Sequence, residues 1–414
     1  MKPLFKISIL FAIVSLFACT EKKVKSLSAK DILGNSDFPA ICYGGFRETT
    51  RDLCPSVEEI KEDMKILAAL NLKIIRTYNT QLFPHAERVL QAIQELKEED
   101  SSFEMYVMLG AWIECEGAFT GTRDHSKENV ASNKAEIKRA IELTQQYPDI
   151  VKIIAVGNES MVHWAETYSV LPKVVLHYVK ELQKRKTQGD LDSTLWITSS
   201  DNFASWGGGS TDYHNNDLNE LIKAVDYISM HTYPFHDTHY NPAFWQIDSS
   251  EIMKDSILLI KEGMDRAAEY AIAQFESTKE YVHQIAPNKP VHIGETGWAC
   301  SAYTKYGKNG SHAADEYKQK LYYDYIRNWS NENKVSCFFF EAFDEPWKDQ
   351  TAESASENHF GLININSEVK YVLWNQVDSG KFQGLRRNNK PLTKTFNGEL
   401  NSLLSISYPP ATKP

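Results

Sequence analysis

The stretch Val151-Lys-Ile-Ile-Ala-Val-Gly157 indicates the fold class, because it is a short apolar run rich in β-branched residues. Such a run is typical of a strand that is buried on both faces of a parallel sheet. Similar runs lie at residues 38–44, 72–78, 104–110, 195–199, 225–230, 290–294 and 335–340. Amphipathic helical patterns lie between them at residues 57–70, 127–146, 170–184, 252–283 and 313–328, and Ser56 is suited to cap the first.

Eight strands that alternate with helices predict an α/β fold, the (β/α)8 TIM barrel, in a single catalytic domain. The alternative is an open doubly wound sheet, but no glycine-rich dinucleotide fingerprint follows the first strand. We expect the domain to cover residues 37–414. Residues 359–372 are compatible with a hairpin, and residues 378–414 show no pattern that assigns them.

The N-terminus has the features expected of a targeting signal. Lys2 and Lys6 accompany an apolar run at residues 7–17, which has the length of a signal peptide and is too short to span a bilayer. It ends in Leu16-Phe17-Ala18-Cys19, which resembles a bacterial lipobox. We therefore expect residues 1–18 to be a signal peptide, Cys19 to be lipidated, and residues 19–36 to be a tether. The alternative is an ordinary secretory signal with a chance cysteine. The lipobox predicts a lipid-anchored protein of the cell envelope.

The overall charge and composition limit the partners. The chain has 414 residues and a net charge of −10 without a long basic run, which argues against binding to nucleic acid. Aromatic residues make up 12% of the chain, and those in loops could stack on sugar rings. Cys42 and Cys54 are close enough in sequence to pair across a loop, but spacing alone leaves this open.

Two carboxylates follow predicted strands at the end where barrel enzymes have their active sites. Glu159 follows the fourth strand in Gly157-Asn-Glu159, and Glu295 follows the seventh in Gly294-Glu-Thr-Gly-Trp298. Glycosidic cleavage needs one carboxyl group to protonate the leaving oxygen and a second to attack the anomeric carbon or activate water. A single glutamate in such a loop is usually a solvated or ion-paired residue. The pair predicts a glycoside hydrolase.

Three motifs make the assignment more specific. Ile154-Ala-Val-Gly-Asn-Glu159, Ile293-Gly-Glu-Thr-Gly-Trp298 and Phe340-Glu-Ala-Phe-Asp-Glu-Pro-Trp-Lys348 together resemble glycoside hydrolase family 17 over residues 38–366. That family contains β-1,3-glucan hydrolases and related transglycosylases. The resemblance implies that Glu159 is the acid/base and that Glu295 is the nucleophile.

Further residues match supporting positions of the family. Asn158 matches a side chain that binds the sugar 2-hydroxyl, and Tyr78 matches a tyrosine near the nucleophile. Glu345 and Lys348 match a charged pair, and Glu357 matches a third carboxylate. Glu159 must start protonated and Glu295 ionised, with Tyr78 as a donor to it. We expect a carboxyl separation of about 5 Å, the spacing of retaining enzymes.

Aromatic residues in the loops are candidates for glucan binding. Tyr233, Phe235 and Trp298 lie nearest the strand ends and are the residues we expect to contact the sugar. Packing within a loop is the competing explanation for each of them. His231 either contacts the ligand or is a satisfied polar residue at its strand end.

The predicted function is endo-acting, retaining hydrolysis of β-1,3-glucan by a monomer. One alternative is a transglycosylase, in which a sugar instead of water intercepts the covalent intermediate. Another, from a different class, is a non-catalytic surface lipoprotein that binds glycan. A metal-dependent hydrolase is disfavoured, since no His/Asp cluster is visible, and we expect neither a metal nor a cofactor.

Overall fold

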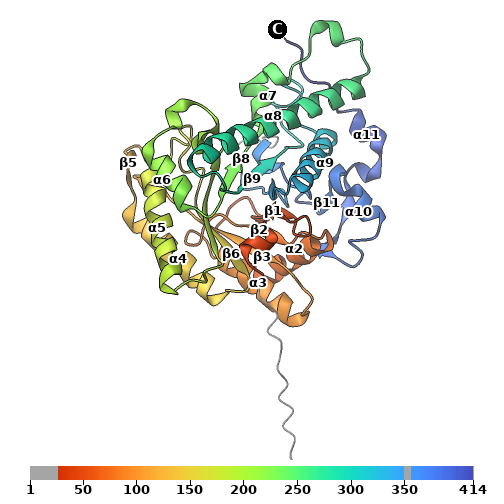
Figure 1. The fold of residues 1–414 in the computed structure, drawn as a ribbon. Coiled ribbons are helices and arrows are strands. Elements are labelled where there is room, and N and C mark those ends of the chain that lie inside the picture. Colours follow the sequence, from red (N-terminus) through yellow and green to blue (C-terminus); the bar gives the residue numbers. More distant parts are fainter. Residues whose placement is uncertain (1–26, 349–355, 414) are drawn as a thin grey trace, which may run out of the picture.

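The computed structural model describes residues 27–348 and 356–413, and in them the eight predicted strands form a barrel. The strands are parallel and close in the order β1-β10-β9-β8-β7-β6-β3-β2 (Figure 1). Their bounds are β1 (Ala40–Cys42), β2 (Ile74–Arg76), β3 (Tyr106–Ala111), β6 (Val151–Asn158), β7 (Trp196–Asn202), β8 (Ile228–His231), β9 (Val291–Gly297) and β10 (Cys337–Phe340). The predicted TIM barrel is therefore confirmed.

Helices surround the barrel, as the patterning predicts. They are α2 (Val57–Ala69), α3 (His85–Glu99), α4 (Val130–Gln146), α5 (Pro172–Gln188), α6 (Asn216–Ala224), α8 (Ser256–Ile285) and α9 (Glu316–Glu332). Ser56 caps α2 by accepting a hydrogen bond from the backbone N–H of Glu59, whose carboxylate accepts one from the Ser56 N–H. α3 and α6 were not predicted. α4 begins later than expected, because residues before it form a hairpin of β4 (Cys115–Glu116) and β5 (Asp124–Glu128).

The folded part begins earlier than predicted. The short helix α1 (Ala29–Ile32) buries Ala29 and Ile32 completely in the core. Gly34 donates a backbone hydrogen bond of 2.8 Å to Ser336 Oγ, just before β10. The predicted tether of residues 19–36 is therefore wrong at its C-terminal end, because an apolar pair in this segment packs on the barrel. The predicted signal peptide and Cys19 lie outside the described residues.

The C-terminal segment packs on the barrel and contains α10 (Trp374–Asp378), α11 (Leu400–Leu404) and the short strands β11 (Glu368–Val369), β12 (Arg386–Arg387), β13 (Lys390–Pro391) and β14 (Thr393–Lys394). The predicted hairpin at residues 359–372 is reduced to one antiparallel bridge between Ile363 and Val369, and β11 pairs with β14 instead. Arg387 is fully buried, and its Nε donates to Asp63 Oδ1 at 2.9 Å on α2. This ion pair ties the end of the chain to the barrel.

Cys42 and Cys54 do not pair. Both thiols are free, and Cys42 is fully buried in β1 with its Sγ 3.8 Å from the carbonyl oxygen of Gly294. Its side chain lies among the barrel strands, while Cys54 lies in the loop before α2. As for membranes, none of the helices in residues 27–348 and 356–413 is long and apolar enough to span one.

Candidate active site

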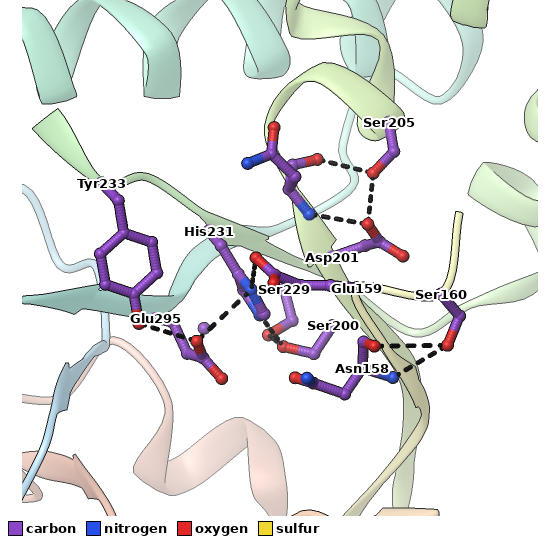
Figure 2. A network of polar contacts seen from close by, with 12 residues as sticks. Asn158, Glu159, Ser160, Ser200, Asp201, Ser205, Ser229, His231, Tyr233 and Glu295 are labelled. Carbon is purple, nitrogen blue, oxygen red and sulfur yellow. Dashed lines mark hydrogen bonds and ion pairs between the residues drawn. The ribbon is translucent and has the colours of Figure 1, made fainter. Parts of the chain in front are cut away.

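A large cleft lies over the C-terminal ends of the barrel strands. Its volume is about 1740 Å³, and both Glu159 and Glu295 line it. Glu159 directly follows β6, the fourth barrel strand, and Glu295 lies within β9, the seventh. Figure 2 shows the two glutamates on either side of His231. The arrangement is the one expected from the two strand-end motifs.

Glu159 is presented by a sharp turn at the end of β6. Gly157 has a φ of +82°, and a Cβ there would lie 2.6 Å from Ser160 Oγ, so the turn requires glycine at this position. Glu159 itself has a φ of +47°, which is uncommon for a side chain of its size. Its backbone N–H donates to the carbonyl of Ser200 at 3.0 Å. The local backbone strain is held in place by the neighbouring strand and directs the carboxyl group into the cleft.

Glu295 is held in an ionised state by its neighbours. It forms an ion pair with the buried Arg76 of β2, and the Tyr233 hydroxyl donates to its Oε2 at 2.8 Å. Burial alone would raise the pKa of Glu295, but the charges of His231 and Arg76 and the hydroxyl of Tyr233 outweigh it and lower that pKa. A deprotonated carboxylate at neutral pH is what a nucleophile requires.

His231 links the two glutamates. Its Nδ1 lies 3.1 Å from Glu159 Oε1 and 3.6 Å from Glu295 Oε2, and its Nε2 lies 2.7 Å from Ser200 Oγ. The ring is fully buried, so His231 is a satisfied polar residue that holds the pair together. One carboxyl oxygen of each glutamate and one nitrogen of His231 lie within 4.8 Å of one another. The donor types would suit a divalent metal, but the Arg76 guanidinium already supplies the positive charge at Glu295.

A second charged cluster lines the cleft beside β10. Lys348 Nζ lies 2.9 Å from Glu345 and 2.8 Å from Glu341, and the Phe46 N–H donates to Glu345 at 3.2 Å. Burial would raise the pKa of Glu345, but Lys348 and the donated hydrogen bonds lower it. The predicted pair of Glu345 and Lys348 is therefore present at the cleft. Glu341, the carboxylate that shares this lysine, was not predicted.

The other predicted polar residues also lie in the cleft. Asn158 Oδ1 accepts a hydrogen bond of 2.6 Å from Arg76 Nη2, so the same arginine orients Asn158 and Glu295. The Tyr78 ring lies under the Arg76 guanidinium at 4.9 Å, and its buried hydroxyl makes no hydrogen bond within the described residues. The predicted donor role of Tyr78 at Glu295 is therefore wrong, and the Tyr233 hydroxyl fills it. Glu357 is 3.6 Å from His236 Nε2 at the rim. Asn158, Tyr78 and Glu357 all line the cleft.

Two predicted sugar contacts are wrong. Phe235 and Trp298 are fully buried, with ring centroids 5.4 Å apart, and neither lines the cleft. Trp298 Nε1 donates to the carbonyl of Ala313 at 2.8 Å, which turns the indole toward the core. Phe235 belongs to the first turn of α7 (Pro234–Tyr240), which directs its ring inward. Tyr233 does line the cleft, where its hydroxyl donates to Glu295.

Sequence reasoning missed Arg76 and Asp201. Arg76 is a charged residue within an apolar strand, a signal of a buried functional group that the sequence does contain. Asp201 accepts a hydrogen bond from Ser205 Oγ at 2.6 Å (Figure 2). It also accepts one from the Met161 N–H at 2.7 Å, which fixes the segment after Glu159. Burial raises the pKa of Asp201 to about 6, and these hydrogen bonds limit the rise.

The Tyr233 hydroxyl provides a direct test of how the ionisation of Glu295 is maintained. Tyr233→Phe removes the donor at 2.8 Å from Glu295 without emptying the ring's packing site. We expect kcat to fall by about 10- to 100-fold with little change in KM, and the acid limb of the pH profile to move to higher pH. Steady-state kinetics from pH 4 to 9 measures both effects. An unchanged acid limb would show that this hydroxyl does not influence the ionisation of Glu295.

An eight-stranded parallel barrel with two facing glutamates at the ends of its fourth and seventh strands defines a glycoside hydrolase. The chain belongs to the family of the BtgE/BtgC glycoside hydrolase domain, whose model matches residues 40–361.

Curated relatives are named as glucan-cleaving enzymes. The chain is 25% identical over 365 residues to the probable glucan endo-1,3-β-glucosidase of Aspergillus flavus, covering 83% of this chain and 45% of that protein. It is 25% identical over 321 residues to the glucan 1,3-β-glucosidase of Schizosaccharomyces pombe, covering 77% of this chain and 82% of that one. The chain therefore spans about half the length of the Aspergillus relative.

Solved structures share the same barrel. An endo-laminarinase from Formosa Hel1_33_131 superposes with a TM-score of 0.92 and 54% identity, covering 94% of this chain and 98% of that one. The glycoside hydrolase family 17 β-1,3-glucanosyltransferase from Rhizomucor miehei superposes with a TM-score of 0.56 and 18% identity, covering 82% and 97%. At that identity the second likeness concerns the fold alone.

Proposed function

We propose that this protein is a retaining, endo-acting hydrolase of β-1,3-glucan. The observation that carries the proposal is the pair of carboxyl groups, Glu159 and Glu295, with an oxygen of each within 4.8 Å of the other. Retaining enzymes place their carboxyl groups about 5–5.5 Å apart, whereas inverting enzymes leave about 6.5–9.5 Å for a water molecule.

The surroundings of each glutamate assign its step. Glu295, ionised beside Arg76 and Tyr233, attacks the anomeric carbon and forms a covalent glycosyl ester, while Glu159 donates a proton to the leaving oxygen. A water molecule then attacks the same anomeric carbon, and the bond between that carbon and the Glu295 oxygen breaks. Glu159, now a carboxylate, takes the proton from that water, and Glu295 leaves as a carboxylate.

The choice of polymer rests on similarity and on the cleft. The 54%-identical structure is that of an endo-laminarinase, and the similarity extends over nearly all of both chains. The cleft also extends well beyond the two glutamates, and aromatic side chains such as Trp112 and Tyr303 contribute to its lining. A long open cleft accommodates a polymer on both sides of the cleaved bond, which supports endo action.

The proposal is tested with four substrates: linear β-1,3-glucan, branched β-1,3-glucan, mixed-linkage glucan and β-1,4-glucan, each with its products sized over time. We expect β-1,3 chains to give intermediate oligosaccharides early, and the anomeric proton signals of the first products to show the β-anomer. Activity on β-1,4 chains alone would contradict the substrate, and a first-formed α-anomer would contradict retention. Products longer than the substrate would indicate transglycosylation, and binding without release of reducing sugar would indicate a glycan-binding protein.

A further inference from the structure

The hairpin of β4 and β5 is an addition to the barrel that reaches the cleft. It lies between β3 and α4 in the chain, and its strands pair with each other and not with the barrel. Backbone hydrogen bonds clamp it to the loop that follows Glu159: Cys115 N–H donates to Tyr168 O at 2.9 Å, and Phe119 N–H donates to Thr167 O at 2.8 Å. Closure of the barrel does not require this hairpin, so another role must explain its fixed position.

Three aromatic rings from the hairpin region and that loop lie against one another. The Trp112 and Tyr168 centroids are 4.7 Å apart, those of Phe119 and Tyr168 are 5.7 Å apart, and those of Trp112 and Phe119 are 6.4 Å apart. We call these three residues the aromatic shelf. All of them line the cleft. Trp112 Nε1 donates to Glu114 Oε2 at 3.1 Å, which fixes the indole and leaves a carboxylate at the edge of the shelf.

Phe119 is hard to explain by packing. It is 63% exposed, although it is a large apolar residue at the cleft. Its φ is +61°, a conformation that costs a residue with a Cβ about 1–2 kcal/mol. A strained and exposed ring that is nevertheless clamped in place points to a ligand, because neither burial nor backbone preference favours it.

The shelf begins beside the acid/base. Ile113, directly after Trp112, accepts a hydrogen bond of 3.2 Å from Ser160 Oγ, directly after Glu159. The Val170 N–H, two residues after Tyr168, donates to the Ser160 carbonyl at 2.7 Å. From Tyr168 the rings continue outward to the exposed Phe119. The acid/base protonates the leaving oxygen, so the departing part of the glucan passes on its side of the cleft, whereas the nucleophile lies beneath the sugar that stays bound.

We propose that Trp112, Tyr168 and Phe119 bind the leaving-group side of a β-glucan, the part toward its reducing end, with Phe119 contacting a sugar beyond the first. This rests on the proposed function. The flat apolar faces of glucose units would stack on the rings, and Glu114 would accept hydrogen bonds from hydroxyl groups at the edge. The shelf therefore sets where along the chain the enzyme cuts.

The test compares Phe119→Ala with Phe119→Tyr, which keeps the ring, and with Met253→Ala, a 93%-exposed apolar residue that does not line the cleft. The first substrate is laminarihexaose, which is cleaved in water enriched in ¹⁸O so that mass spectrometry identifies the bond that was cut. The second is nitrophenyl laminaribioside, whose leaving group contains no sugar. For Phe119→Ala we expect kcat/KM on the hexaose to fall by about 3- to 10-fold, with cleavage moved toward the reducing end. The nitrophenyl substrate should be cleaved at the wild-type rate, and Phe119→Tyr should restore the hexaose pattern.

A cleavage pattern that stays unchanged in Phe119→Ala, or that moves toward the non-reducing end, would overturn the proposal. A wild-type enzyme that does not cleave laminarihexaose at all would instead contradict the proposed function. A thermal melt separates ligand binding from a structural role. Phe119→Gly relieves the left-handed strain, so its melting temperature should not fall although its hexaose activity does. A clear loss of stability in that variant would assign Phe119 to packing and would also overturn the proposal.

Discussion

Glu295→Gln is expected to lower kcat on β-1,3-glucan by on the order of 10⁴-fold or more, with KM nearly unchanged. The amide keeps the size of the side chain and cannot form the glycosyl ester. The buried position of Glu295, only 5% exposed, leaves no space for another nucleophile to replace it without rearrangement. Initial rates on laminarin-type polymer and on nitrophenyl laminaribioside measure the loss.

The matched control is Glu116→Gln, because the Glu116 side chain is 58% exposed on the hairpin and does not line the cleft. It should keep wild-type rates. The smaller variant Glu295→Ala adds a stereochemical test, since azide can enter the vacated space and attack the anomeric carbon from the nucleophile's side. An azide product of inverted configuration is expected. Glu295→Gln with substantial activity, or an azide product of retained configuration, would exclude Glu295 as the nucleophile.

Arg76→Met is expected to have the second-largest effect, a loss of at least 100-fold in kcat together with about 3 kcal/mol of stability. Arg76 is 1% exposed, and its removal leaves Glu295 as a buried charge without its ion pair and the carbonyl of Gly294 without its 3.0 Å donor. Arg76→Lys keeps a charge but not the fork that also reaches Asn158, so an intermediate loss is expected.

The pH dependence gives Arg76 a specific signature. The pKa of Glu295 is lower in the folded protein than in the unfolded chain. Ionisation of Glu295 therefore stabilises the fold fully at pH values above its pKa in the unfolded chain. This stabilisation is lost as the pH falls through its pKa in the folded protein. Without the guanidinium that pKa rises. The acid limb of activity and the acid loss of stability should therefore both move to higher pH. Arg185→Met, on a residue with a 41% exposed side chain, should move neither. A variant with low activity and an unmoved acid limb would limit Arg76 to a structural role.

The barrel could be predicted from sequence because each strand is buried on both faces. The β6 run, for example, is buried from Val151 to Gly157, so burial selects the apolar pattern that identifies it. The unpredicted helix α3 also carries a usable pattern, with Ala86, Val89, Leu90 and Ile93 buried on one face. The nine-residue α6 is too short for such a pattern to stand out. Most of the fold was therefore available in local periodicity.

The site was predictable only where its residues follow strands in the chain. Glu159 and Glu295 follow from strand-end position and chemistry. Arg76 contacts Glu295 across 219 residues of sequence, so only the closed barrel shows that they meet. Phe235 and Trp298 show the opposite error. Being near a strand end in sequence does not determine the direction of a side chain, and both rings turn into the core.

Helix α1 bears on how the enzyme would be oriented at a surface. Its neighbour Gly34 contacts Ser336 and the carbonyl of Lys334, which precede β10 at the end of the barrel opposite the cleft. Lipidation of Cys19 stays a prediction. If the chain is attached to a membrane through the segment before Leu27, the attachment is at the end of the barrel opposite the cleft. The open cleft would then face outward, and a polymer too large to pass beneath the protein could enter it from the surrounding solution.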